Sequence, residues 1–322
     1  MKEFLNYQDD LSKLSEKDLE YLFILLKDYK LQYRKNLGLD TFASFGLELE
    51  FEHVLLRYVE KEFSKYPYCY SWFVHFDKSC GYEIDGFEIG GEATSPIMHD
   101  EEADWKMLTN VIAILLGLRC RITKRTSLHV HAGVQIFQED IKNVVRFIKV
   151  WCIFEHVIFK FGYGTDRTNR PDILYFAHPI ADALKLKCKY IPDFLENLLV
   201  PYALGFDKKW AVSFKNYQEL SSKEIMGNDI EFRIANGTLN RTIIQNTVNF
   251  YLKLMQYVTS DRYDEDLINH LFQKLRPKDF SKYSGLYAKD ALMLADLIFD
   301  NNLDKINFLK QYVKKDENVF IR

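Results

Sequence analysis

The sequence lacks any C-x-x-C pair, and its five cysteines are widely scattered and odd in number. They are Cys69, Cys80, Cys120, Cys152 and Cys188. This arrangement argues against a disulfide framework and against a zinc site built from thiolates. It suits a protein that works in a reducing cytosol.

The sequence also lacks a long apolar run and a strong net charge, and we expect no signal peptide. The apolar stretch from Val111 to Leu118 is far too short to span a bilayer. The first segment, Met1 to Asp10, turns acidic where a signal peptide would become apolar. A net charge of -3 carries no signature of nucleic-acid binding. We therefore expect a cytoplasmic protein with no membrane partner.

Apolar and aromatic side chains, in contrast, are plentiful. Hydrophobic residues make up 48% of the 322 residues, aromatic residues 15% and charged residues 28%. A chain of this length can bury a sizeable core without help from disulfides or metals. The length allows one large domain with additions, or two domains of ordinary size.

The spacing of apolar residues changes along the chain between helical and strand-like periods. It predicts a helix within Leu11–Tyr33, started by Ser15 and stopped at Gly38. Strands and single helices then alternate as far as a strand at Asp229–Ala235, and helices follow from Arg241. The intermediate elements are strands at 45–52, 72–79 and 127–137, helices at 53–65, 104–118 and 138–161, a glycine-rich segment at 81–96 and a loop at 162–171. This order predicts an α+β fold with helices on one face of a mixed or antiparallel sheet.

Three short segments share one construction, in which two ionisable residues stand two positions apart with apolar neighbours. They are Gly46-Leu-Glu48-Leu-Glu50, Ser127-Leu-His129-Val-His131-Ala-Gly133 and Ile230-Glu231-Phe-Arg233-Ile234. On a strand, side chains two apart project from the same face. Each segment therefore presents a polar pair on one side and anchors its apolar residues on the other.

A single alternating strand of this kind is usually just the solvated face of a half-exposed sheet. The residues collected here, however, are acids, two histidines and an arginine. Carboxylates with imidazoles suit divalent metals, and carboxylates alone suit magnesium or manganese. An arginine beside them suits a phosphate or a developing oxyanion. Together the three segments favour a functional site.

A fourth segment adds two candidate metal ligands, Asp77 and Glu92, within Val74–Ser79 and Gly86–Pro96. Its glycines allow a tight turn or the close approach of backbone to a ligand. Taken alone this segment is ordinary hairpin chemistry.

The ordered set G-L-E-L-E, D-x-S, G-G-E-A-T-S-P, L-H-V-H-A-G and I-E-F-R-x-x-N-G-T-L resembles the amidoligase family. That family is similar to glutamine synthetase and glutamate–cysteine ligase in fold and active-site design. The resemblance covers about Phe45 to Asn240. It implies a curved, mainly antiparallel sheet with helices on one face. We expect a helical N-terminal extension over 1–41, a catalytic domain over 42–250 and a helical C-terminal segment over 251–322.

The resemblance also implies roles for individual residues. The expected metal ligands are Glu48, Glu50, Asp77, Glu92, His129 and Glu231. The expected catalytic residues are Glu50, Glu231 and Arg233, with Arg233 contacting the transferring phosphoryl group. The residues expected to face nucleotide or substrate are His131, Arg167, Lys209 and Asn236. Ser213 stands where the family often has an Asn.

The implied function is an ATP-dependent carboxylate–amine ligase that uses Mg²⁺ or Mn²⁺ and forms an amide through an acyl phosphate. Phosphoryl transfer needs mainly positioning and charge neutralisation. This need matches a site rich in carboxylates and arginine without an obvious nucleophile. One alternative is a metal-dependent hydrolase that uses the His-x-His and carboxylate set. Another is a binding module of the same fold without turnover. The carboxylate and amine substrates and the oligomeric state stay open, and no role falls to His53, His99, His156 or His178.

Overall fold

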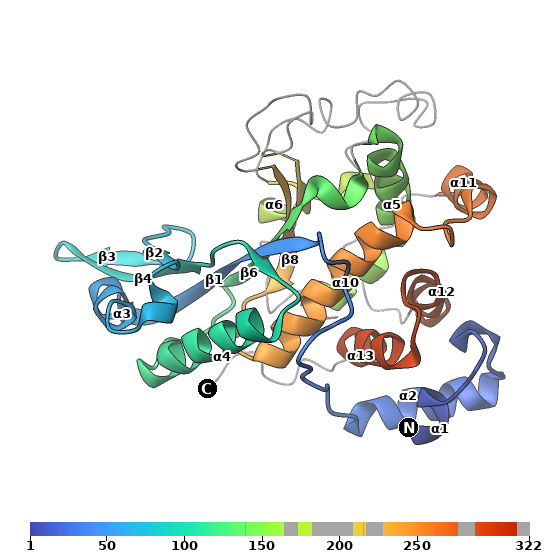
Figure 1. The fold of residues 1–322 in the computed structure, drawn as a ribbon, viewed down its shortest axis with the longest axis horizontal. Coiled ribbons are helices and arrows are strands. Elements are labelled where there is room, and N and C mark those ends of the chain that lie inside the picture. Colours follow the sequence, from blue (N-terminus) through green and yellow to red (C-terminus); the bar gives the residue numbers. More distant parts are fainter. Residues whose placement is uncertain are drawn as a thin grey trace.

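The computed structural model describes residues 1–138, 140–163, 173–181, 209–214, 216, 228–275 and 287–313. Helices and strands mix along the chain as the sequence predicts (Figure 1). The strands are β1 (Ser44–Leu55), β2 (Phe73–His75), β3 (Tyr82–Ile84), β4 (Phe87–Thr94), β5 (Met98–His99), β6 (Ser127–Gly133), β7 (Val212–Ser213) and β8 (Asp229–Asn236). The α-helices are α1 (Lys2–Leu5), α2 (Glu16–Asp28), α3 (Leu56–Phe63), α4 (Glu102–Gly117), α5 (Ile141–Tyr163), α6 (Ile173–Phe176), α10 (Arg241–Thr259), α11 (Glu265–Gln273), α12 (Ala288–Ile298) and α13 (Asn302–Val313). Short 3₁₀ helices are η1 (Leu11–Lys13), η2 (Pro67–Cys69) and η3 (Val134–Phe137).

The eight described strands form one sheet in the order β2-β4-β1-β6-β8-β7, with β3 beside β4 and β5 beside β1. Every pairing between these strands is antiparallel. The α+β prediction with an antiparallel sheet is therefore confirmed. Among the described residues, no helix combines the length and apolar character needed to cross a membrane.

One face of this sheet is covered by helices α4, α5 and α10 (Figure 1). On β8, the ring of Phe232 stacks on Tyr251 of α10, with centroids 4.1 Å apart, and also meets Trp151 of α5. On β1, Phe45 stacks on Trp105 of α4 at 5.1 Å. Aromatic contacts of this kind add to the stabilisation that burial of the rings provides. The alternating apolar residues of the central strands thus face a dry core, and the polar residues between them face the other way.

The sequence predicted a helix from His53, but β1 continues through a bulge at this residue and ends at Leu55. The register of β1 against β4 shifts between Phe51 and Leu55, and His53 adopts φ 69 within the bulge. Helix α3 therefore begins only at Leu56. Three residues of β1 stand against one residue of β4 between the pairs formed by Phe51 and Leu55, and such a bulge bends the strand. The predicted strand over 127–137 is also shorter, because β6 ends at Gly133 and a 3₁₀ turn follows.

The N-terminal helix starts where the sequence predicts but ends earlier. The Ser15 side chain accepts a hydrogen bond from the backbone of Asp18 and caps α2. The helix stops at Asp28, not near Tyr33 or Gly38. The following segment is held in an irregular path because both carboxylate oxygens of Asp100 accept the backbone N–H of Leu37. Tertiary hydrogen bonds here override helical periodicity.

The N-terminal segment packs on the C-terminal helices. Leu22 and Leu26 of α2 are fully buried, and α2 contacts α13. The carboxylate of Asp296 accepts hydrogen bonds from the backbones of Leu11 and Ser12. The segment therefore completes the core, while the domain boundaries stay a prediction.

Two glycines of β4 let a loop come close to the sheet. Gly90 has φ +79 and Gly91 has φ +151. A Cβ on Gly91 would lie 2.3 Å from the carbonyl oxygen of His75, the residue that leads into the loop carrying Asp77. Any larger residue at position 91 would push this loop away.

We predict that Gly91→Ala lowers the free energy of unfolding by about 2 kcal/mol or more, because it combines backbone strain with a steric clash. Gly117→Ala is the matched control. It lies at the end of α4 with no atom within 4 Å of an added Cβ, and should leave stability unchanged or slightly raised. Urea denaturation followed by circular dichroism measures both. Equal stability of the two variants would contradict the prediction.

Candidate metal centre

The register of the central strands brings the polar motifs together on the face of the sheet opposite to the one that packs on α4, α5 and α10. Glu48 lies opposite Thr94 on one side and His129 on the other. Glu50 lies opposite Glu92, and His131 lies opposite Glu231. Neighbouring strands lie about 4.8 Å apart, so these side chains share one compact surface. Residues far apart in the sequence thus converge as the alternating pattern predicted.

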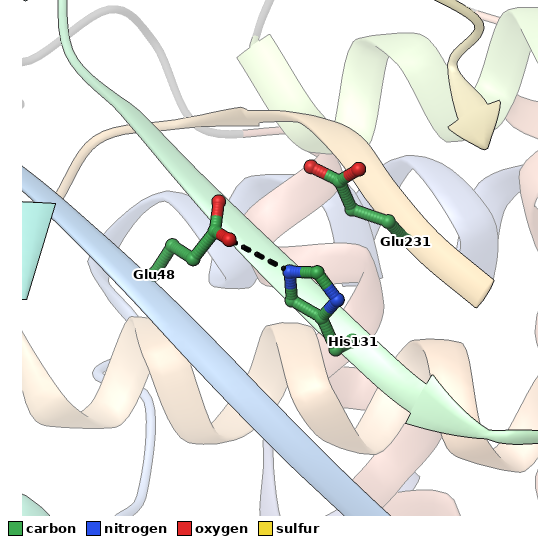
Figure 2. A group of neighbouring side chains, drawn as sticks. All are labelled: Glu48, His131 and Glu231. Carbon is green, nitrogen blue, oxygen red and sulfur yellow. Dashed lines mark hydrogen bonds and ion pairs between the residues drawn. The ribbon is translucent and has the colours of Figure 1, made fainter. Parts of the chain in front are cut away.

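The first cluster consists of Glu48, His131 and Glu231, from β1, β6 and β8 (Figure 2). Each offers one metal-ligating atom, and these atoms all lie within 4.8 Å of one another. His131 Nε2 is 3.0 Å from Glu48 Oε1. A cation seated among them would have one imidazole and two carboxylates as ligands.

His129 adjoins this cluster in a buried position. Its Nδ1 lies 2.7 Å from Glu48 Oε2 and 3.4 Å from Glu231 Oε1. Its Nε2 lies 3.6 Å from Glu50 Oε1. The structure therefore brings both histidines to the site, while the division of roles between them stays a prediction.

The second cluster consists of Glu50, Asp77 and Glu92, whose oxygen atoms also lie within 4.8 Å of one another. Glu50 and Glu92 come from the paired strands β1 and β4, whereas Asp77 comes from the loop after β2. An Asx turn orients Asp77, since its Oδ1 accepts the backbone N–H of Ser79 at 2.7 Å. This all-oxygen set matches the preference of magnesium and manganese.

Arg125 fastens the loop that carries Asp77. One guanidinium nitrogen donates to the carbonyl oxygens of Ser79 and Gly81, at 3.1 and 3.3 Å. The other forms an ion pair with the buried carboxylate of Glu52, at 3.2 Å. The loop is thereby tied to β1, the strand that supplies Glu48 and Glu50.

Charge interactions within the first cluster favour an ionised carboxylate between protonated imidazoles. Burial opposes the ionisation of Glu48, but hydrogen bonds from His129 and His131 hold its pKa well below the ordinary value. Burial likewise disfavours charge on His131, yet hydrogen bonds to Asp229 and Glu48 raise its pKa to about 10. The hydrogen bond to Glu48 similarly raises the pKa of His129. The charges of the two imidazoles and the carboxylate thus stabilise one another.

In the second cluster, three carboxylates face longer imidazole contacts: His75 Nε2 lies 3.5 Å from Glu92 Oε1, and His129 Nε2 lies 3.6 Å from Glu50 Oε1. Burial, followed by the charge of Glu48, raises the pKa of Glu92 to about 8, and Asp77 and Glu50 add to the effect. A divalent cation would relieve this repulsion and supply the charge that the carboxylates need. The residues present therefore fit the magnesium or manganese that the sequence predicted.

The four remaining predicted site residues lie in different places. Arg233 forms an ion pair with Glu231 and so joins the first cluster. Lys209 lies by the edge strand β7, where its Nζ is 4.1 Å from the ring centroid of Tyr175 and donates to that hydroxyl at 3.0 Å. Asn236 is buried opposite Ser127, and Arg167 lies outside the described residues.

The sequence analysis did not identify three residues that contact the two clusters or the loop of Asp77, namely His75, Asp229 and Arg125. His75 Nε2 lies 3.5 Å from Glu92 Oε1 and 2.9 Å from Thr94 Oγ1. Asp229 Oδ1 lies 3.1 Å from His131 Nδ1. Asp229 continues the two-residue spacing of Glu231 and Arg233 and was therefore detectable. Arg125 had no local signal, because its partners are distant in the sequence.

No model of a known protein family matches this chain, and no curated protein sequence matches it.

The raised pKa of Glu92 predicts a pH dependence of stability in metal-free buffer. The folded state keeps a proton on this carboxyl up to about pH 8, whereas the unfolded chain loses it near 4.5. The free energy of unfolding should therefore fall as the pH rises between these values, by up to about 1.4 kcal/mol per pH unit.

Glu92→Gln should flatten this dependence between pH 5 and 6.5, below the range in which the raised pKa values of His131 and His129 add a dependence of the same sign. Glu88→Gln, which removes an exposed carboxylate from the same strand, is the control and should keep the wild-type dependence. Chemical denaturation in the presence of a chelator at several pH values measures the slope. A wild-type slope in Glu92→Gln would show that another group causes it.

Proposed function

We propose that this protein is an ATP-dependent carboxylate–amine ligase of the amidoligase type, with Mg²⁺ or Mn²⁺ held by the two clusters. The observation that carries the proposal is the pairing of two three-ligand sets on one sheet face, with an arginine beside one of them. We also propose that the antiparallel sheet and its helical cover represent a glutamine-synthetase-like architecture. The sequence motifs from Phe45 to Asn240 support both proposals.

The proposed reaction has two chemical steps. A carboxylate oxygen of the substrate attacks the γ-phosphorus of ATP, and ADP leaves to give an acyl phosphate. An amine then attacks the acyl carbon, inorganic phosphate leaves and the nitrogen loses a proton, which yields the amide. Phosphorylation is needed because an oxide ion is too poor a leaving group for direct amide formation.

The chain's own residues would position the reactants and balance charge. Glu48, His131 and Glu231 would hold one cation, and Glu50, Asp77 and Glu92 another. Bound cations neutralise phosphate charge and polarise the oxygens that they bind. Arg233 lies beside Glu231 and would donate to the transferring phosphoryl group. An arginine in this role can change the rate by about three to five orders of magnitude.

A metal-dependent hydrolase is the second candidate, and one observation favours it. With the adjoining His129, the first cluster offers two imidazoles and a carboxylate, which is a ligand set that catalytic zinc uses. The neighbouring all-carboxylate cluster suits magnesium better than zinc, and the arginine suits phosphate. The ligase is therefore the better supported proposal.

Thermal stability with added ligands distinguishes the two candidates. ATP and Mg²⁺ together should raise the melting temperature, whereas neither alone should do so to the same extent. At about a hundred times its dissociation constant the nucleotide should stabilise the fold by about 2.7 kcal/mol. Arg233→Ala should weaken this response. Arg57 is a surface arginine stacked on Phe87, and Arg57→Ala should leave the response unchanged.

No response to ATP with Mg²⁺, together with a strong response to zinc alone, would replace the ligase with the hydrolase. Binding of ATP with Mg²⁺ but no phosphate release with any acid and amine would indicate a binding module without turnover.

A further inference from the structure

The polar face of the sheet ends at an exposed aromatic side chain, Phe73. Phe73 lies opposite Thr94, which in turn lies opposite Glu48. His75, two residues further along β2, contacts both Thr94 and Glu92, so this side of β2 faces the metal centre. Phe73 is 64% exposed, and two strand spacings place its backbone about 10 Å from that of Glu48.

A second large apolar side chain, Ile97, lies on the same face. The next residue, Met98, pairs with Phe45 and is fully buried in the core, so alternation points Ile97 to the opposite side. Ile97 is 75% exposed. If the pairing of Phe45 with Met98 is continued by one residue, Ile97 lies opposite Gly46 of β1. On the opposite edge of β1, Gly46 pairs with His131 of β6. A Cβ on Gly46 would lie 3.6 Å from His131 Cβ and 3.9 Å from Ser95 Oγ, so this glycine lies directly beside His131.

The two ends of the polar face differ in chemistry. At the β7 and β8 end stand the cationic groups Arg233 and Lys209. On the opposite side of Glu48 stand Phe73 of β2, in register with Thr94 and Glu48, and Ile97, which directly precedes β5. Cations at one end attract phosphates. Exposed apolar side chains at the other end gain stability when a ligand covers them.

We propose that Phe73 and Ile97 form an apolar subsite that binds the side chain of the carboxylate substrate. The inference rests on the ligase proposal and narrows its substrate class to acids with an aromatic or branched aliphatic side chain. The carboxylate of such an acid lies toward the metal centre, and its apolar part covers Phe73. A dicarboxylate is disfavoured because its second charge faces apolar carbon and the nearby acids.

Binding of two acids of opposite character tests the subsite without turnover. Hydrocinnamate and glutarate are titrated by saturation-transfer NMR in the presence of Mg²⁺ and a non-hydrolysable ATP analogue. Hydrocinnamate should bind more tightly than glutarate. Phe73→Ala and Ile97→Ala should each raise its dissociation constant by up to about tenfold and leave that of glutarate unchanged.

Two variants on α2, far from this end of the sheet, serve as matched controls (Figure 1). Tyr21→Ala and Ile24→Ala remove exposed apolar side chains of similar size and should leave both constants at the wild-type value. The subsite is overturned if hydrocinnamate does not bind, if glutarate binds as well, or if the control variants change binding as much as Phe73→Ala.

A parallel assay separates failure of the subsite from failure of the proposed function. The wild-type protein is incubated with ATP, Mg²⁺, hydroxylamine and each acid, and hydroxamate and phosphate are measured. Hydroxamate from glutarate but not from hydrocinnamate keeps the ligase and overturns the subsite. Hydroxamate from hydrocinnamate supports both. Products from neither acid, despite apolar binding, argue against the ligase while the NMR result still decides the subsite.

Discussion

The antiparallel pairing of β1 with β4 and β6 is the constraint on which the rest of this structure depends. That pairing fixes which residues of the three strands lie side by side, and the two-residue period then sorts them between two faces. Leu47 and Leu49 enter the core, while Glu48 and Glu50 face away from it. A slip of one residue would bury the acids and expose the leucines. The core and the candidate metal centre are therefore specified by the same register.

The gathered carboxylates create an electrostatic cost that the fold meets in two different ways. Around Glu48, the imidazoles of His129 and His131 supply hydrogen bonds and positive charge. Around Glu92, His75 Nε2 lies 3.5 Å from the carboxylate, but burial and the neighbouring carboxylates still raise the pKa of Glu92 to about 8. A bound cation would remove this difference. The sheet and Arg125 thus hold the second cluster in place, although its three carboxylates repel one another.

The sequence predicted what local patterning controls and missed what tertiary contacts control. The alternation around Glu48, His129 and Glu231 identified the strands and the face correctly, because period two is a local property. The bulge at His53 and the early end of α2 were missed, because the chain path there follows pairing with β4 and hydrogen bonds to Asp100. The grouping of Glu50 with Asp77 and Glu92 needed the strand register, which a single sequence does not contain.

The most direct test of the account is to count Mn²⁺ ions per chain by electron paramagnetic resonance. The account predicts two sites in the wild-type protein. Glu231→Gln should lose one and Asp77→Asn the other, whereas Glu88→Gln should keep both. A single site, none at all, or two sites retained in both ligand variants would contradict the claim that this sheet face is a centre for two divalent cations.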